Sequence, residues 1–481
     1  MAYIMVMGLE IHAELLTKSK LFCTCTAEFG GDPNTRACPV CAGMPGALPV
    51  LNRQAVENTV RFGYALNCGI NRFSRWDRKN YFYPDLPSAY QISQLDLPLC
   101  IAGKVNVEAE DGSWSKDIRI NRIHLEADAG KLVHDDFNAV SLADYNRSSI
   151  GLMEIVTEPD FRSAEEVRIF VEKVNQLLRY SGVCDGKMEQ GSMRVDVNLS
   201  VMKDTDTEFG TRTEMKNLNS VKSIVRAIDF EAKRQIALLE SGKPVKQETR
   251  RFNENRGDTK ALRSKEDAHD YRYFPDPDIP PVRFTEDDLA RIRAELPELP
   301  DSRLARYTGE FGLSKTDAQI LLAQVSTSDF FDAAVRAYNN PRSVASFVLV
   351  ELLRRVNLGE ATMEGLPFTA DAFADLVRMA DEEKVSKNDA KTLLRFMIET
   401  GKAPEALAKE HGFLIVNDLS AVEAKIDEIL AANAAAVEQY RAGEQKVFGF
   451  LMGLCTKELR GVSTPKAIKE ALEAKLAASG N

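Results

Sequence analysis

The chain has 481 residues, 44% of them hydrophobic, and its formal net charge is −10. This composition is typical of a globular protein with about three domains, and it excludes a disordered chain and a chain that is basic throughout. No apolar run reaches the roughly 20 residues that a membrane helix requires, and the first residues lack a basic leader, so we expect a cytoplasmic protein that does not contact membranes.

Alternating patterns in residues 1–285 predict an antiparallel sheet with one apolar face and one charged face. A long helix that begins after Ser220 and ends before Gly242 is predicted by its capping residues. Helices of this kind would cover the apolar face of the sheet, which gives a mixed α+β domain. The predicted strands are residues 3–14, 118–128, 152–158, 193–201 and 211–217.

Three acidic residues and one histidine fall on the predicted charged face, namely Glu10, His12, Glu126 and Glu154. Carboxylates that lie within a few ångströms of one another raise each other's pKa or bind a cation. Oxygen ligands with one imidazole suit Mg²⁺ or Mn²⁺ better than Zn²⁺. Lys79, Arg194 and Lys216 could bind phosphate oxygens, so the pattern favours phosphoryl chemistry on an open sheet.

Each of these strands, taken alone, is equally compatible with a solvated polar face. His12 is also compatible with a buried structural histidine. His124 is ambiguous in the same way, and we assign it no role.

Four of the eight cysteines form two close pairs, Cys23 with Cys25 and Cys38 with Cys41. Two such pairs separated by a Gly/Asp/Pro/Asn loop are typical of a tetrahedral zinc site, which is closed and structural. The alternative is four small buried side chains without a metal. The other cysteines have no partner at ligand spacing and are interpreted as packing residues.

A proline-rich segment separates the N-terminal half from a helical half. Residues 271–300 contain six prolines and predict a boundary or an extended connector. The chain then becomes rich in Ala, Leu, Glu and Lys with helical spacing, for example in the helix predicted between Ser386 and Gly401. With a weaker break near Pro404, we expect a sheet domain over residues 1–292, a helical domain over 293–405 and a helical tail domain over 406–481.

Two segments are locally basic. Residues 243–265 carry eight Lys/Arg against three acids, and could contact RNA phosphates or form a solvated loop. From Arg441 onward there are seven Lys/Arg against four acids, which makes the tail a candidate nucleic-acid contact. The candidate residues in the tail are Lys446, Lys457, Arg460 and Lys466.

Several motifs resemble one known family. They include GLEIHAEL (8–15), RKNYFYPDLPSAYQISQ (78–94), GLMEIVTEPD (151–160) and TRTEMKNLNSVKSI (211–224). Together with the cysteine segment and the tail, they resemble the B subunits of aspartyl/glutamyl-tRNA amidotransferases over nearly the whole chain. No phosphate-binding loop of the GxxxxGK[ST] type occurs, so any ATP would be bound on the sheet.

The resemblance implies a ligase that uses ATP to phosphorylate the side-chain carboxylate of Glu-tRNA(Gln) or Asp-tRNA(Asn), after which ammonia displaces phosphate. Ammonia would come from glutamine hydrolysed in the amidase, or A, subunit, and the small C subunit would join the other two. It also implies a cradle domain that is similar to the glutamine synthetase catalytic fold, followed by an α-helical domain and an α-helical tail domain that contacts tRNA.

The resemblance further implies roles for individual residues. Glu10, His12, Glu126 and Glu154 would hold the catalytic Mg²⁺, and the four cysteines would hold structural Zn²⁺. The residues expected to line the substrate site or the ammonia channel are Lys79, Tyr81, Tyr83, Arg194 and Lys216. Two other functions stay open, a non-catalytic tRNA-binding scaffold and a free-standing amino-acid kinase or ligase.

Overall fold

The computed structural model of the chain describes residues 3–135, 137–264, 270–415, 419–459 and 462–478. The residues cluster into two compact units, Met1–Pro300 and Asp301–Asn481. The first unit holds a large sheet and its helices, whereas the described part of the second unit is helical. The predicted α+β class is therefore confirmed, while the division into three domains stays a prediction.

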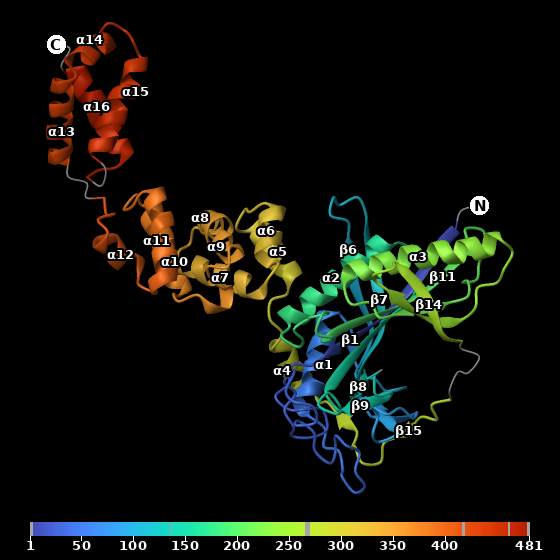
Figure 1. The fold of residues 1–481 in the computed structure, drawn as a ribbon. Coiled ribbons are helices and arrows are strands. Elements are labelled where there is room, and N and C mark those ends of the chain that lie inside the picture. Colours follow the sequence, from blue (N-terminus) through green and yellow to red (C-terminus); the bar gives the residue numbers. More distant parts are fainter. Residues whose placement is uncertain (1–2, 136, 265–269, 416–418, 460–461, 479–481) are drawn as a thin grey trace. The chain divides into compact units, whose positions relative to one another are not determined.

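A nine-stranded sheet forms the centre of the first unit (Figure 1). All neighbouring strands are antiparallel except β12 and β13, which are parallel. The five predicted strands are present as β1, β7, β10, β11 and β12. In spatial order the sheet consists of β14 (Asp258–Ser264), β13 (Glu248–Asn253), β12 (Thr213–Lys216), β11 (Met193–Lys203), β1 (Tyr3–Glu14), β10 (Gly151–Thr157), β7 (Ser115–Ala127), β6 (Cys100–Glu108) and β2 (Gly69–Ile70).

One face of this sheet is buried under three helices, α1 (Arg53–Ala65), α2 (Ala164–Tyr180) and α3 (Val221–Glu240). In β1 the buried parity includes Leu9 and Ile11, which join the same core as the apolar residues of these helices. Burying each such side chain contributes about 1.5–3 kcal/mol. The opposite parity carries polar side chains, and we call this side of the sheet the charged face.

Two predicted helices begin and end at the residues that the sequence indicated. Ser220 accepts a hydrogen bond from the Ser223 amide at the start of α3, and Ser241 follows the last residue of that helix. In the second unit, Ser386 caps α11, and Gly401 ends it with a φ of 70°. A left-handed residue at this position is typical of glycine, which has no side chain to clash.

Short strands surround the edge of the charged face. They are β3 (Phe73–Ser74) paired with β16 (Val282–Arg283), β4 (Asp77–Asn80) between β5 (Tyr90–Ser93) and β15 (Phe274–Pro275), and the hairpin β8 (Lys131–Asp135) and β9 (Val140–Asp144). The proline-rich segment thus contributes two strands and the helix α4 (Glu286–Ala294) to the first unit. It packs there because Ile279, Leu289 and Ile292 are buried in the core of the sheet domain. The boundary expected after residue 292 falls inside α4, whereas the compact unit ends at Pro300.

The second unit consists of helices. They are α5 (Pro300–Gly309), α6 (Lys315–Leu322), α7 (Val325–Ala337), α8 (Pro341–Ser346), the π-helix η2 (Phe347–Leu352), α9 (Leu353–Asn357), the 3₁₀ turn η3 (Met363–Gly365), α10 (Ala370–Asp381), α11 (Lys387–Thr400), α12 (Pro404–Glu410), α13 (Leu419–Ala432), α14 (Ala434–Arg441), α15 (Lys446–Glu458) and α16 (Pro465–Ala478). The last four helices share a core that includes Val422, Leu451 and Leu472. Over the described ranges, no helix has the length and apolar content needed to cross a membrane.

A buried carboxylate ties α3 to three strands at one edge of the sheet. Glu231 is 0% exposed and accepts hydrogen bonds from Thr213 on β12 (3.0 Å) and Thr259 on β14 (3.1 Å). Its oxygens also lie 2.6 Å from Arg234 Nη2 and 3.3 Å from Arg250 Nε. Burial alone would raise the pKa of Glu231, but these partners outweigh burial and lower it. The carboxylate is therefore ionised and fixes the position of β12 relative to the helix layer.

Replacing Glu231 with Ala is expected to lower the free energy of unfolding of the sheet domain by about 3–5 kcal/mol, because buried Arg250 loses one of its two carboxylate partners. Both tryptophans, Trp76 and Trp114, lie in this domain. Tryptophan fluorescence during denaturation of the full chain therefore reports on the sheet domain alone. The control is Glu240→Ala at the exposed end of α3, which should unfold like the unsubstituted protein. Equal stability of both variants would contradict the structural role of Glu231.

Candidate active site and metal centre

Three of the four predicted magnesium ligands meet on the charged face. Ligand atoms of His12, Glu126 and Glu154 lie within 4.8 Å of one another. His12 on β1 is paired in register with Glu154 on β10, and its Nε2 lies 3.4 Å from Glu154 Oε2. Glu126 is on β7, and Ser93 Oγ donates a 2.8 Å hydrogen bond to its Oε2. One imidazole and two carboxylates at this spacing fit a hard divalent cation. We call these three residues the first acidic group.

Glu10 belongs to a second acidic group, in which its carboxylate lies within 4.8 Å of those of Asp196 and Glu214. Side chains that project from the same face of a strand are spaced about 6.6 Å apart. The side chains of Glu10 and His12 therefore lie nearest to two different positions along β1, and not around one cation. Glu10 is paired with Asp196 on β11, whereas His12 faces β10 through Glu154. The predicted four-residue site is thus divided between two neighbouring groups.

Lys216 supplies a cation to the second group. Its Nζ lies 2.6 Å from Asp196 Oδ2 and 3.1 Å from Glu214 Oε1. Burial alone would lower the pKa of this lysine, but the two carboxylates outweigh burial and raise it. Asn198 donates a 3.0 Å hydrogen bond to Glu10 Oε1, and Thr249 donates a 2.7 Å bond to Glu214. Sequence reasoning missed Asp196 and Glu214 as site residues, although both alternate with apolar residues in predicted strands.

His124, which received no role from the sequence, lies beside the first group. Its Nε2 is 3.2 Å from Glu154 Oε2 and 3.4 Å from Glu126 Oε2. Burial alone would lower the pKa of His124, but these carboxylates raise it to about 9. A protonated imidazole therefore balances part of the negative charge at neutral pH. The signal for this residue was its two-residue spacing from Glu126, which places both side chains on one face of β7.

Lys79 brings a further cation near the first group from the small sheet of β15, β4 and β5. Burial alone would lower its pKa, but Glu126, Tyr273 and Glu154 together raise it. Its Nζ lies 5.2 Å from the ring centroid of Tyr271 and 5.8 Å from that of Tyr81.

These tyrosines form part of an aromatic wall around Lys79. The rings of Tyr81 and Tyr271 are in edge contact, as are those of Tyr271 and Tyr273. Burial raises the pKa of Tyr81 to about 12, so its hydroxyl stays protonated. Tyr83, by contrast, is 59% exposed. The sequence prediction for this region included Tyr81 and Tyr83 but missed Tyr271 and Tyr273, which come from the proline-rich segment.

Arg194 on β11 is paired in register with His12 and already has a carboxylate partner. Its Nη2 is 2.7 Å from Asp128 Oδ2 and 3.9 Å from Glu14 Oε1. Burial and the charge of Asp128 raise the pKa of Glu14 to about 7, although Arg194 opposes this rise. A carboxylate ligand would therefore bind Arg194 only in competition with Asp128.

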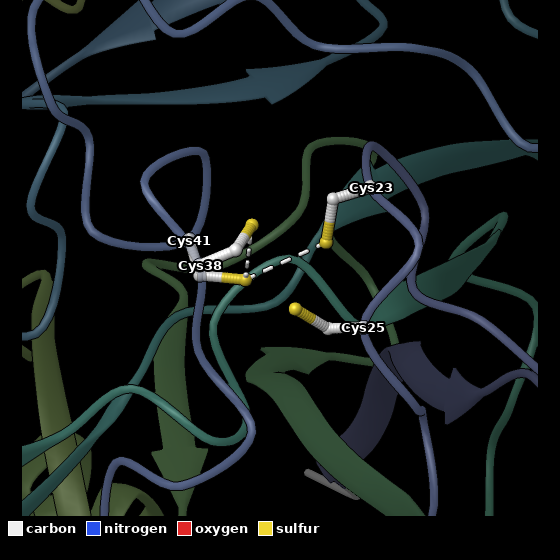
Figure 2. Close-up of side chains that lie close together, drawn as sticks. All are labelled: Cys23, Cys25, Cys38 and Cys41. Carbon is white, nitrogen blue, oxygen red and sulfur yellow. Dashed lines mark hydrogen bonds between the residues drawn. The ribbon is translucent and has the colours of Figure 1, made fainter.

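The four predicted zinc ligands converge from two loop segments (Figure 2). Ligand atoms of Cys23, Cys25, Cys38 and Cys41 all lie within 4.8 Å of one another. The Sγ atoms of Cys23 and Cys41 are 3.5 Å apart, and those of Cys38 and Cys41 are 3.8 Å apart. Four thiols at this spacing fit a tetrahedral zinc ion.

A fully buried lysine contacts this cysteine cluster. Lys20 is 0% exposed, and its Nζ lies 3.3 Å from Cys41 Sγ and 3.2 Å from the Tyr145 carbonyl oxygen. The hydrogen bond from Cys23 and the charge of Lys20 lower the pKa of Cys41 well below its usual range. No sequence pattern pointed to Lys20, because lysine is almost always exposed.

Three of the four candidate residues in the tail are described. Lys446 and Lys457 are exposed on α15, and Lys466 lies near the start of α16. Arg460 lies outside the described residues.

Known proteins match both halves of the chain. The family described as GatB/GatE catalytic domain matches residues 5–290, and the family described as GatB domain matches residues 329–476. The B subunit of the aspartyl/glutamyl-tRNA(Asn/Gln) amidotransferase of Ruminiclostridium cellulolyticum is 55% identical over 476 residues, which cover 99% of this chain and 98% of the relative. The chain belongs to the family of aspartyl/glutamyl-tRNA(Asn/Gln) amidotransferase B subunits.

Other members of this B-subunit family match over the same length. Those of Caldicellulosiruptor saccharolyticus and Carboxydothermus hydrogenoformans are 48% and 46% identical, and each match covers 99% of both chains. The family predicted from the motifs is therefore confirmed. Both acidic groups and the cysteine cluster lie within residues 5–290, the part that matches the family's catalytic domain.

In the chain loaded with Zn²⁺, replacing Lys20 with Gln is expected to weaken zinc retention by about tenfold, because the Lys20 ammonium would offset part of the negative charge of four thiolates around the ion. The measurement is transfer of zinc from the full chain to a colorimetric chelator. Lys18→Gln is the matched control, since Lys18 is exposed and two residues away. Equal zinc retention in the two variants would show that Lys20 does not support the site.

Proposed function

We propose that this protein is the subunit of a glutamine-dependent tRNA amidotransferase that activates and amidates the aminoacyl group. ATP would phosphorylate the side-chain carboxylate of Glu-tRNA(Gln), Asp-tRNA(Asn) or both, giving an acyl phosphate and ADP. Ammonia would then attack the acyl carbon, and phosphate would leave as the amide forms. The observation that carries this proposal is the pair of acidic groups side by side on the charged face, in a chain of the B-subunit family.

The first acidic group is suited to hold Mg²⁺ through His12, Glu126 and Glu154. A bound Mg²⁺ stabilises the negative charge that spreads over phosphoryl oxygens during transfer. Ser93 orients Glu126 by its hydrogen bond, and His124 contacts both carboxylates, so the ligands are held before any cation binds. His124 thereby acts as a positioning residue.

The second acidic group is suited to a further divalent cation, because its three carboxylates exceed the charge of the Lys216 ammonium beside them. Such a cation would in turn hold the nucleotide phosphates. A cavity of about 240 Å³ adjoins Glu10 on the same face. We place the nucleotide base in this cavity, whose wall includes exposed Phe209 and Arg212 as stacking surfaces. The other lining residues are Val6, Gly8, Leu9, Val156, Thr157, Pro159, Asn198, Ser200 and Gly210.

Lys79 and the surrounding tyrosines are suited to the acyl end of the substrate. An acyl phosphate hydrolyses unless water is kept away until ammonia arrives. The rings of Tyr81, Tyr271 and Tyr273 would exclude water, while the Lys79 ammonium would bind an oxygen of the activated carboxylate. We assign Arg194 with Asp128 to the opposite wall of this site.

In this role the protein would work in an assembly with two other subunits and with tRNA. Ammonia would come through a channel from the amidase, or A, subunit, with the small C subunit joining the assembly in the cytoplasm. Misacylated tRNA would contact the tail through its lysines. The cysteine cluster would hold structural Zn²⁺, and the charged face of the sheet would correspond to the active face of a glutamine-synthetase-like fold.

Replacing Glu126 with Gln is expected to lower the rate of ATP- and glutamine-dependent amidation by about a thousandfold, because a cation ligand and its charge are lost. Binding of the aminoacyl-tRNA should change by no more than about twofold. The assay follows amidated tRNA formed by the assembled enzyme, and Glu240→Gln on the exposed end of α3 serves as the control.

The outcomes separate three functions. Normal amidation by the Glu126 variant would favour a non-catalytic tRNA-binding scaffold. Turnover on free glutamate or aspartate without tRNA would favour a free-standing kinase or ligase. Loss of amidation with retained tRNA binding would support the transamidase.

Replacing Lys446, Lys457 and Lys466 together with Gln is expected to weaken tRNA binding and to reduce the salt dependence of the binding constant. Each phosphate contact contributes about 0.7–0.9 to the slope of log K against log salt, so the slope should fall by about 2–3. The charge-retaining triple Arg variant should bind with the original slope. An unchanged slope in the Gln variant would show that these lysines do not contact tRNA.

A further inference from the structure

A line of cations extends from the second acidic group to the edge of the sheet. The register pairs Lys216 on β12 with Arg251 on β13, and Arg251 with Lys260 on β14. Residues paired across neighbouring strands project from the same face of a sheet. Arg251 and Lys260 therefore lie on the charged face, in one row with Lys216, and β14 is the edge strand at this end.

Arg251 and Lys260 differ from two neighbouring cations, Arg250 on β13 and Arg256 in the turn between β13 and β14. Arg250 is paired with Glu231 and Glu248, and Arg256 is paired with Asp258. Arg251 and Lys260, by contrast, are exposed and form no ion pair with any residue that the structure describes. Like charges directly opposite each other on antiparallel strands are destabilising. The two side chains together therefore provide an uncompensated positive site suited to an anionic ligand.

The position of this site favours a chain of phosphates over a nucleotide. Successive strands are about 4.8 Å apart, so β13 and β14 lie about 5 and 10 Å from β12, the last strand that contributes to the second acidic group. The nucleotide cavity lies in the opposite direction, over β1, β10 and β11. A single nucleic-acid strand whose terminal residue reaches the acidic groups would continue along this row toward the edge of the sheet.

We propose that Arg251 and Lys260 bind the backbone phosphates of the single-stranded 3′ end of the aminoacyl-tRNA. This inference rests on the proposed function, because it takes the aminoacyl group to react at the two acidic groups. Proteins that bind single strands use rows of cations that follow the backbone. The pair positions the aminoacyl end and takes no part in the chemical steps.

The test compares the double variant Arg251→Gln/Lys260→Gln with a matched control in the assembled enzyme. The control is Lys243→Gln/Lys246→Gln, which removes two exposed cations from the same basic segment but outside the row. The KM for aminoacyl-tRNA should rise about tenfold in the double variant, and the salt slope of binding should fall by about 1.4, the value for two single-strand phosphates. The KM for ATP, and kcat at saturating tRNA, should stay within about twofold. The control should retain all four values.

A second measurement uses the RNA in place of a protein variant. A minihelix with the single-stranded 3′ end should bind the unsubstituted enzyme with a salt slope about 1.4 larger than the same helix with a blunt end. In the double variant this difference between the two RNAs should vanish. Persistence of the difference would overturn the inference even if the variant were less stable.

Other outcomes identify other ligands. A rise in the KM for ATP alone would assign the two cations to the nucleotide phosphates and overturn the inference. Loss of co-purification with the amidase would assign them to a protein partner and also overturn it. If the unsubstituted enzyme amidates no tRNA, the proposed function itself fails. Normal amidation with an unchanged double variant rejects only the role of Arg251 and Lys260.

Discussion

Like charges on one face of the sheet must be held close together against their mutual repulsion, and this constraint underlies the whole site. The opposite face of the sheet holds them in place. Glu10 and His12 alternate with Leu9 and Ile11, which are buried beneath the helices, so the strand cannot rotate to relieve the repulsion. The apolar core therefore fixes the positions of acids that would separate if they were on a flexible loop.

Charge compensation completes this arrangement. The first acidic group has the protonated His124, the second has Lys216, and the Glu14–Asp128 pair has Arg194. Each set of acids thus has a cation beside it, which offsets part of the repulsion. The second group still has three carboxylates beside the ammonium of Lys216, so it keeps a net negative charge that a bound cation would offset. Because acids and cations come from several strands, a shift in the register of any one strand would leave an acid and a cation unpaired.

Features that depend on residues close together in the sequence could be predicted from it. Alternation located the main strands, capping residues located α3 and α11, and the spacing of cysteines located a cluster that the structure assembles. The division of the acids into two groups was not predictable, because it depends on which strands lie on either side of β1. That order arises from pairings between segments more than a hundred residues apart.

Other residues escaped prediction for similar reasons. Tyr271 and Tyr273 lie in a segment whose prolines indicated a connector, yet buried Ile279 anchors that segment on the sheet domain. Lys20 was missed because only its contact with Cys41 explains a buried ammonium. In both cases the decisive contact joins residues that no local pattern connects.

The central position of β1 also affects how the protein is made. This strand is synthesised first, but its partners β10 and β11 follow roughly 140 or more residues later, which takes about 7–30 s on the ribosome. Until then both of its edges are unpaired, and its apolar residues could recruit other nascent chains. Glu10, His12 and Glu14 interrupt that apolar pattern at every second position, as charged gatekeepers do in aggregation-prone strands. The polar side chains of β1 would therefore protect the nascent chain before any active site exists.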